Sequence, residues 1–155
     1  MVRGEFRFQN GLIVPNNVTI AGAQAILAGF ARNTVPVFHI GLCSAVYEPD
    51  LTLADIVEPT IATNGYARLA VARDSTGWPG DGLVNDEPYI ETLALVFEAD
   101  GGEFDQPVTR MFLTPEATAT VGVVYALSGA LPEEFVIDED TLEVDRTFKY
   151  RIYLR

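Results

Sequence analysis

Turn-forming residues divide most of this 155-residue chain into short apolar segments. From residue 34 onward, clusters of Gly, Pro, Asn and Asp recur at intervals of roughly ten residues. The segments between them are rich in the β-branched and aromatic residues that favour strands. About seven to nine short strands, without alternation of strand and helix, are typical of an antiparallel β-sandwich or barrel. The chain is therefore predicted to be mainly β.

One helix is predicted near the N-terminus. Apolar residues at three- and four-residue spacing run from Ile20 to Ala31, and Thr19 stands where it can cap the first turn. Asn33 is the expected stop, because Asn tolerates the left-handed conformation that follows a helix end. The helix is therefore placed at about residues 19–32.

The stretch after the helix contains the most apolar strand. Residues 36–43 are largely apolar on both faces, which predicts a central strand. Residues 51–58 are predicted to form a single helical turn, with Thr52 as its cap and Asp55 at its third position. A hairpin that turns at Asn10-Gly11 precedes the helix. The other expected strands lie at 66–72, 88–98, 108–114, 118–127, 135–137 and 148–154, and the Pro- and Gly-rich residues 78–82 are expected to form a loop.

Length and charge restrict the functions that the chain can serve. Its length is that of one domain, and no linker or internal repeat divides it. Ten basic residues against 22 acidic ones give a net charge of −12, which disfavours nucleic acids and anionic membranes as partners. The single Cys excludes an internal disulfide, and we find no apolar run of the kind that forms a signal peptide or membrane span. We predict one domain over residues 1–155, with 1–12 and 146–155 as candidate interaction arms or edge strands.

The sequence lacks the common catalytic and metal-binding patterns. His39 is the one histidine, which excludes a multi-histidine metal site, and Cys43 lies too far along the same strand to pair with it. Both are expected to be core residues. The seven carboxylates in residues 133–145 lack the glycine of a calcium loop and are predicted to form a solvated acidic edge. We therefore predict a non-enzymatic protein with no catalytic residue, no metal and no cofactor.

Basic and aromatic residues remain as candidates for contact with a partner. Six of the ten basic residues lie near the chain ends, and nine of the ten are Arg, which suits an interface but equally fits a GC-rich genome. Residues 148–154 alternate apolar and mostly basic side chains, which predicts a strand with an outward basic face. Trp78 is either a contact residue or a ring folded back over the sheet. The residues predicted to make interactions are Arg3, Arg7, Trp78, Lys149, Arg151 and Arg155.

Four sequence elements follow one another between residues 18 and 73. The first is the helical segment from Val18 to Ala31. The others are Phe38-His-Ile-Gly-Leu42, Leu53-Ala-Asp-Ile-Val-Glu58 and Gly65-Tyr-Ala-Arg68. Their order and spacing resemble those of small structural proteins of tailed-bacteriophage virions. The second half of the chain is similar in its run of short strands and acidic turns.

The resemblance implies a β-sandwich or jelly-roll subunit located in the virion and synthesised in the host cytoplasm. The first expectation is a head decoration or cement protein that stabilises contacts between capsomers. Its partners would be further copies of itself, for instance in a trimer, and a major capsid or other virion protein. Neither nucleic acid nor membrane is an expected partner.

A second role is compatible with the same resemblance. A tail- or fibre-associated β-sandwich module would bind a host glycan or another tail protein. That role requires a shallow face of aromatic and acidic residues, for which Trp78, Asp81 and Tyr89 are the candidates. The sequence contains no collagen-like or coiled-coil extension of the kind that a long fibre requires.

Overall fold

The computed structural model describes residues 2–32, 38–132, 137 and 146–154. Within these residues one α-helix and nine strands are arranged around one large and one smaller hydrophobic cluster. In chain order the elements are β1 (Val2–Phe8), β2 (Ile13–Val18), α1 (Ile20–Arg32), β3 (Phe38–Cys43), the 3₁₀ turns η1 (Leu53–Asp55) and η2 (Thr63–Gly65), β4 (Leu69–Val71), β5 (Gly80–Val84), β6 (Glu87–Glu91), β7 (Arg110–Thr114), β8 (Ala126–Ser128) and β9 (Phe148–Leu154).

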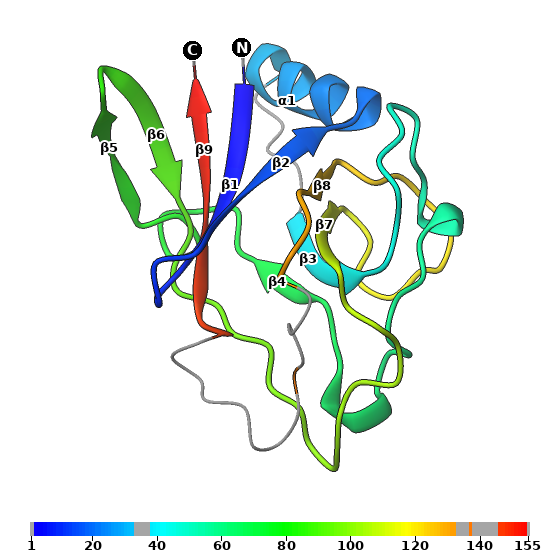
Figure 1. Cartoon of the computed structure of the whole chain (residues 1–155). Coiled ribbons are helices and arrows are strands. Elements are labelled where there is room, and N and C mark those ends of the chain that lie inside the picture. The colour runs from blue at the N-terminus through cyan, green and yellow to red at the C-terminus, as the bar shows by residue number, and fades with distance from the viewer. Residues whose placement is uncertain (1, 33–37, 133–136, 138–145, 155) are drawn as a thin grey trace.

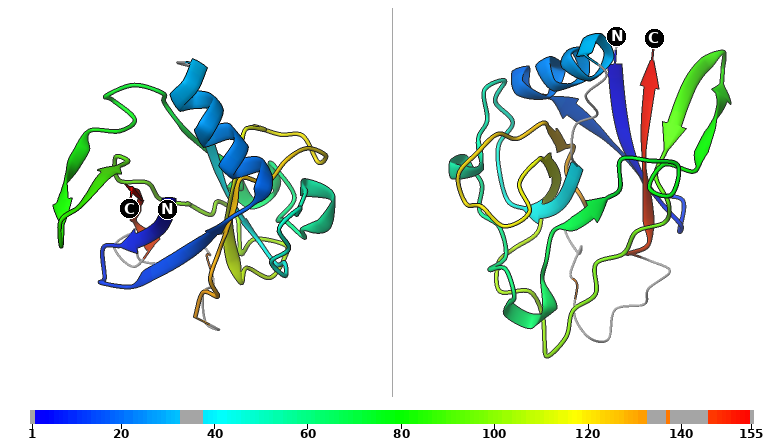
Figure 2. Two further views of the ribbon diagram at one scale, coloured as in Figure 1. Left: turned by 90° about the horizontal axis from the view of Figure 1, so that it is seen from above. Right: turned by 180° about the vertical axis from the view of Figure 1, so that it is seen from behind.

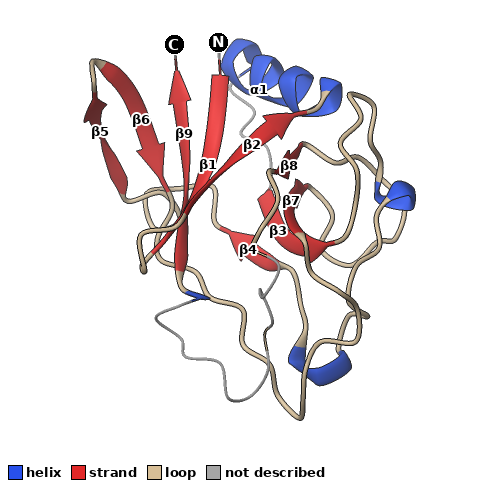
Figure 3. Ribbon diagram, viewed as in Figure 1, coloured by secondary structure: helices blue, strands red, loops and turns tan. Residues whose placement is uncertain are grey.

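The strands form one continuous sheet in the order β4-β3-β7-β8-β2-β1-β9-β6-β5. Every neighbouring pair is antiparallel, and the sheet curls around its own inner face (Figures 1 and 3). The predicted mainly-β class, antiparallel pairing and single N-terminal helix are confirmed. The strands lie in one curled sheet rather than in two packed sheets, so the jelly-roll arrangement is not confirmed.

The first and last strands lie in the interior of the sheet order. β1 pairs with β2 on one side and with β9 on the other, and β9 in turn pairs with β6. Seven residue pairs join β1 to β9, which is the longest ladder of the sheet. The terminal segments that we expected to be arms or edge strands are therefore inner strands, because each has a neighbour on both sides.

The start of α1 agrees with the sequence prediction. The Thr19 side-chain oxygen accepts a hydrogen bond from the Gly22 N–H at 3.1 Å, which caps the first turn. The hairpin before the helix also forms, with β1 and β2 joined by a turn at residues 9–12. The helix is described to Arg32, and the expected stop at Asn33 lies outside the described residues.

The larger hydrophobic cluster lies on the inner face of the curled sheet, and a smaller one lies on the opposite face of β3, β7 and β8. Alternation along β1 directs Phe6 and Phe8 inward, where the Phe6 ring meets Phe148 edge-on with centroids 5.8 Å apart. Burial of such large rings is the main stabilising contribution in a chain of this size. The largest fully buried side chains are Tyr66, Tyr153, Phe6, Phe112, Phe148, Ile40, Leu42, Met111, Leu113, Leu127, Val124 and Thr19.

Several strand predictions were wrong in their bounds. Residues 78–82, expected to be a loop, contribute the start of β5 at Gly80. β5 and β6 form a hairpin whose turn residues Asn85 and Asp86 both have positive φ, of 51° and 64°, as a tight two-residue turn requires. The strand expected at 88–98 ends at Glu91.

In the second half of the chain the expected strand at 118–127 contracts to the three residues of β8. Of the expected strand at 135–137, only Ile137 is described, and it is a buried non-strand residue. The acidic segment 133–145 otherwise lies outside the described residues. The last predicted strand, 148–154, is confirmed as β9.

Three of the four sequence elements that carry the resemblance meet in a buried polar cluster. The Arg68 guanidinium donates to both carboxylate oxygens of Glu58 at 2.9 and 2.7 Å, and the Tyr66 hydroxyl donates to the same carboxylate at 2.6 Å. The backbone N–H of Leu42 in β3 donates to the Tyr66 hydroxyl at 2.9 Å. We call Glu58, Tyr66 and Arg68 the buried cluster. The buried cluster holds the segments that follow η1 and η2 against β3.

The predicted turn at residues 51–58 is confirmed as η1. The Asp55 carboxylate accepts hydrogen bonds from the Thr52 N–H at 2.9 Å and from its hydroxyl at 2.6 Å. These two bonds lower the pKa of Asp55. Asp55, the Asp of the element Leu53-Ala-Asp-Ile-Val-Glu58, therefore stabilises a local turn.

Candidate interaction surface

One face of three neighbouring strands presents a grid of charged and aromatic side chains. The registers place Arg3 beside Tyr153, Glu5 beside Arg151, and Arg7 beside Lys149. The third strand, β6, continues the same rows with Tyr89 next to Tyr153 and Glu91 next to Arg151. We call this surface the outer face, and its residues are Arg3, Glu5 and Arg7 of β1, Glu87, Tyr89 and Glu91 of β6, and Lys149, Arg151 and Tyr153 of β9.

Glu91 is the acidic centre of one half of the outer face. Its carboxylate accepts a hydrogen bond from Lys149 at 3.0 Å and one from the Arg151 Nε at 2.8 Å. Its own burial is nearly complete, whereas the Lys149 side chain is 48% exposed. Charge-assisted pairs of this kind hold long side chains in one orientation. The basic groups are therefore presented to solvent from fixed positions.

Glu5 is the acidic centre of the other half. The buried Tyr153 hydroxyl donates to its carboxylate at 2.7 Å, and Arg7 donates to the same oxygen at 2.8 Å. The neighbouring Arg3 pairs with Glu87 across to β6 at 2.8 Å. The network thus crosses all three strands, and it connects residues that are up to 148 positions apart in sequence.

Aromatic rings fill the space between the charges. The Arg151 guanidinium lies 3.8 Å from the centroid of the Tyr89 ring, and that of Arg3 lies 4.2 Å from the Tyr153 ring. The two tyrosine rings are 5.9 Å apart. Planar guanidinium groups stacked on Tyr are typical of protein interfaces, where Arg and Tyr are enriched. The outer face has the composition of a contact surface.

The outer face also differs in charge from the remainder of the molecule. It carries four basic and three acidic residues, for a net charge of +1. The other six basic and nineteen acidic residues of the chain give −13. Opposite potentials on partner surfaces steer association and fix orientation. A weakly cationic, well-ordered face on a strongly acidic protein is therefore suited to a partner that presents carboxylates.

Acid is expected to weaken this network. Burial by itself raises the pKa of Glu91, but the hydrogen bonds from Lys149 and Arg151 outweigh it, so the pKa lies below its ordinary value. A carboxyl group with a depressed folded-state pKa stabilises the fold above its unfolded pKa, and this contribution is lost as pH falls through the folded pKa. We expect the free energy of unfolding to fall between about pH 5 and pH 3, more steeply in the wild type than in Glu91→Gln. Urea unfolding at each pH measures both slopes, and equal slopes would contradict the assignment.

The structure brings four of the six predicted interaction residues together. Arg3, Arg7, Lys149 and Arg151 all lie on the outer face. Arg155 lies outside the described residues. Of the acidic and aromatic members of the face, only Tyr89 was considered from the sequence, as a candidate for a glycan site, although alternation with apolar residues along β1, β6 and β9 carried the signal for the others.

Trp78 lies elsewhere, against the core. Its ring meets Phe38 at 5.7 Å and Tyr150 at 6.4 Å, both edge-on, so the ring is folded back over the sheet. Tyr89 belongs to the outer face, whereas Asp81 lies on the other face of the hairpin, opposite Ile90. The three residues considered for a glycan site therefore form no common surface.

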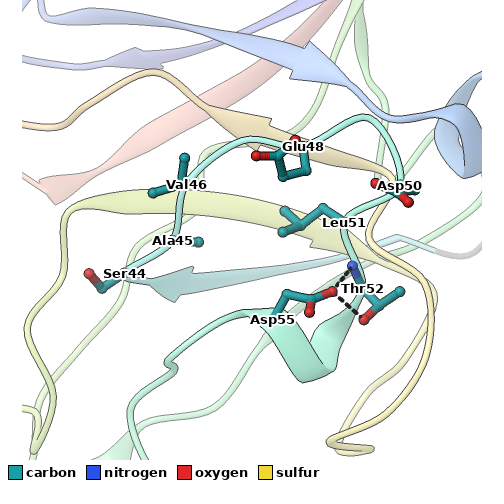
Figure 4. Close-up of a pocket in the computed structure, with 8 residues that line it drawn as sticks. All are labelled: Ser44, Ala45, Val46, Glu48, Asp50, Leu51, Thr52 and Asp55. Carbon is teal, nitrogen blue, oxygen red and sulfur yellow. Dashed lines mark hydrogen bonds between the residues drawn. The ribbon is translucent and has the colours of Figure 1, made fainter.

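A surface cavity lies near the other end of the sheet, between β3 and η1 (Figure 4). It has a volume of about 700 Å³. Its walls combine an apolar floor with three carboxylates, and the Asp55 carboxylate is already engaged by Thr52. Its lining residues are Ser44, Ala45, Val46, Glu48, Asp50, Leu51, Thr52 and Asp55. In the part of the chain that the structure describes, no group of three or more His, Cys, Asp or Glu residues could hold a metal ion.

His39 and Cys43 occupy the positions in β3 that the sequence suggested. Cys43 is fully buried, and burial raises the pKa of its thiol to about 12, which keeps the thiol protonated. His39 is half-buried rather than fully buried, and its pKa is lowered chiefly by burial. The ring does form a hydrogen bond with the Pro115 backbone, which opposes the effect of burial on the pKa, whereas its Nδ1 atom has no hydrogen-bond partner among the described residues.

Comparisons of this chain with protein-family models, with curated proteins and with solved structures give no match. Among the described residues, no helix has the length and apolar character needed to cross a membrane.

Proposed function

We propose that this chain is a non-enzymatic structural subunit of a virion, and that it decorates the head by binding capsid subunits through the outer face. In this role it bridges neighbouring capsomers and associates with further copies of itself. The assignment to a virion rests on the resemblance of residues 18–73 to small structural proteins of tailed bacteriophages.

The observation that carries the docking part of the proposal is the ordered, charge-paired outer face. Arg3, Arg7 and Lys149 are the basic residues of the face that reach solvent, and each is held by a carboxylate of its own chain. Side chains ordered before binding lose less entropy when they dock. A preorganised cationic surface therefore favours stable attachment to an acidic protein surface.

Locating the chain in intact particles tests this function. Virions of the phage whose genome encodes the chain are imaged by electron cryomicroscopy, with and without its gene. We expect density at capsomer boundaries that disappears on deletion, with β1, β9 and β6 facing the shell. Absence of the chain from purified virions, or density at the tail tip, would contradict the proposal.

A further inference from the structure

The hairpin of β5 and β6 ends the sheet with an open edge. β5 is the last strand of the sheet order, and among the described residues its only strand partner is β6. Figure 2 shows this hairpin extending away from α1 and from the rest of the sheet. The pairing of β6 with β9 stops at Tyr89, next to Pro88, which has no N–H to donate to a further ladder position. The hairpin tip therefore diverges from β9.

The free backbone groups of β5 can be assigned from its register. The two-residue turn makes Val84 and Glu87 a hydrogen-bonded pair. Because hydrogen-bonded and non-hydrogen-bonded pairs alternate along an antiparallel ladder, Asp81 and Leu83 lie in non-hydrogen-bonded pairs with β6. Their N–H and C=O groups point away from β6. Two donors and two acceptors thus stand in a row along the edge, with the spacing that an added strand requires.

Natural edge strands are usually protected against such pairing. Common devices are Pro, charged side chains (especially Lys), a β-bulge or a very short strand. The opposite edge strand, β4, has only three residues. β5 has five residues, its one charged side chain is Asp81, and its Leu83 side chain is 70% exposed. The edge of β5 is therefore long enough to pair with an added strand, whereas the edge of β4 is short.

The side chains at this edge indicate the chemistry of the added strand. The Tyr89 ring lies across Gly82, whose added Cβ would stand 3.0 Å from the Tyr89 hydroxyl oxygen, so the ring offers an apolar surface beside the edge. On the opposite face, Asp81 is exposed and forms no ion pair with any described residue. The nearby Asp86 adds a second exposed carboxylate at the turn. The edge is therefore acidic on one face and aromatic on the other.

We propose that β5 binds an extended segment of a partner protein by strand addition, and that this segment alternates basic and apolar residues. The basic residue opposite Asp81 directs its own N–H and C=O to the β5 backbone, because directly opposed residues of a hydrogen-bonded pair share a face. The next residue, which is apolar, packs over Gly82 and against the Tyr89 ring. Charge complementarity favours such a segment over a second copy, since a second β5 edge offers no basic residue to pair with Asp81.

A labelled octapeptide of alternating Lys and Val is the probe for this site. Titrated into the full-length protein, it should shift the backbone amide resonances of residues 80–84 and bind with a measurable affinity by fluorescence polarisation. Leu83→Lys should weaken binding about tenfold or more, because it places a like charge at the edge. Val121→Lys is the matched control, because Val121 is also 70% exposed and lies in a distant loop, and it should bind as the wild type does.

Backbone pairing is tested by methylation of the probe. N-methylation of its Lys residues should abolish binding, whereas N-methylation of its Val residues should leave it intact, because only the Lys amides face β5 in the proposed register. Failure of the unmodified peptide to shift residues 80–84, or equal binding by Leu83→Lys, would overturn the proposal. Shifts that depend on protein concentration alone and vanish in Leu83→Lys would place a second copy at the edge and overturn it equally. None of these measurements involves virions, so they are independent of the proposed head location.

Discussion

Replacing Arg68 with Met is expected to lower the free energy of unfolding by about 3–5 kcal/mol. The Arg68 side chain is only 1% exposed, and its partner Glu58 is 13% exposed. Besides the two bonds to Glu58, the guanidinium donates to the carbonyl oxygens of Glu116 at 2.8 Å and Ala119 at 2.9 Å. Met fills much of the same volume but removes the donor of two carbonyls and leaves the Glu58 carboxylate with the hydrogen bond from Tyr66 and no neutralising charge. The loss is therefore dominated by unpaired polar groups.

Two further variants separate this cause from a general loss of charge. Arg7→Met removes an ion pair of similar length, 2.8 Å, in which the Arg7 side chain is 35% exposed, and it should cost less, about 1 kcal/mol, because Glu5 keeps its hydrogen bond from Tyr153. The double variant Arg68→Met with Glu58→Gln should recover part of the loss, because the buried negative charge is gone. Urea unfolding of the three variants measures these differences. A cost for Arg68→Met no larger than that for Arg7→Met would show that the buried cluster does not hold the fold.

The sequence was most informative where one local rule decided the outcome. The alternation of residues 148–154 places basic side chains on one face whatever the neighbouring strands are, and β9 forms as predicted. Thr19 caps α1 because the cap depends on residues within one turn. Local sequence was misleading for β5. Its two glycines indicated a loop, yet the tight turn at Asn85 and Asp86 and the Tyr89 ring over Gly82 make it a strand.

The partners on the outer face could not be predicted from the sequence. Glu91 and Arg151 are 60 positions apart, and the register between β6 and β9 that joins them depends on how the whole sheet closes. The residues next to Glu91 in the sequence do not distinguish this carboxylate, which pairs with two cations, from the many carboxylates that lie in turns. The inner position of β1 and β9 was missed for the same reason, since strand order follows from long-range pairing.

Reversing charge on the outer face is expected to abolish the proposed docking to the capsid. In Arg3→Glu with Lys149→Glu, the net charge of the face changes from +1 to −3, and the two altered side chains are those that are 45% and 48% exposed. Like charges brought together at an interface cost several kcal/mol, so affinity should fall on the order of a hundredfold. The fold should survive, because exposed ion pairs contribute about 1 kcal/mol or less each.

Binding of this double variant to virions that lack the chain is the most direct test of the proposed function. Arg32→Glu with Arg73→Glu is the matched control, because it makes the same change in net charge at two exposed positions off the outer face. Thermal unfolding first establishes that both variants are folded, and co-sedimentation with the virions then measures their binding. We predict that the wild type and the control sediment with the virions, and that the outer-face variant stays in the supernatant. Equal sedimentation of both variants would contradict docking through β1, β9 and β6.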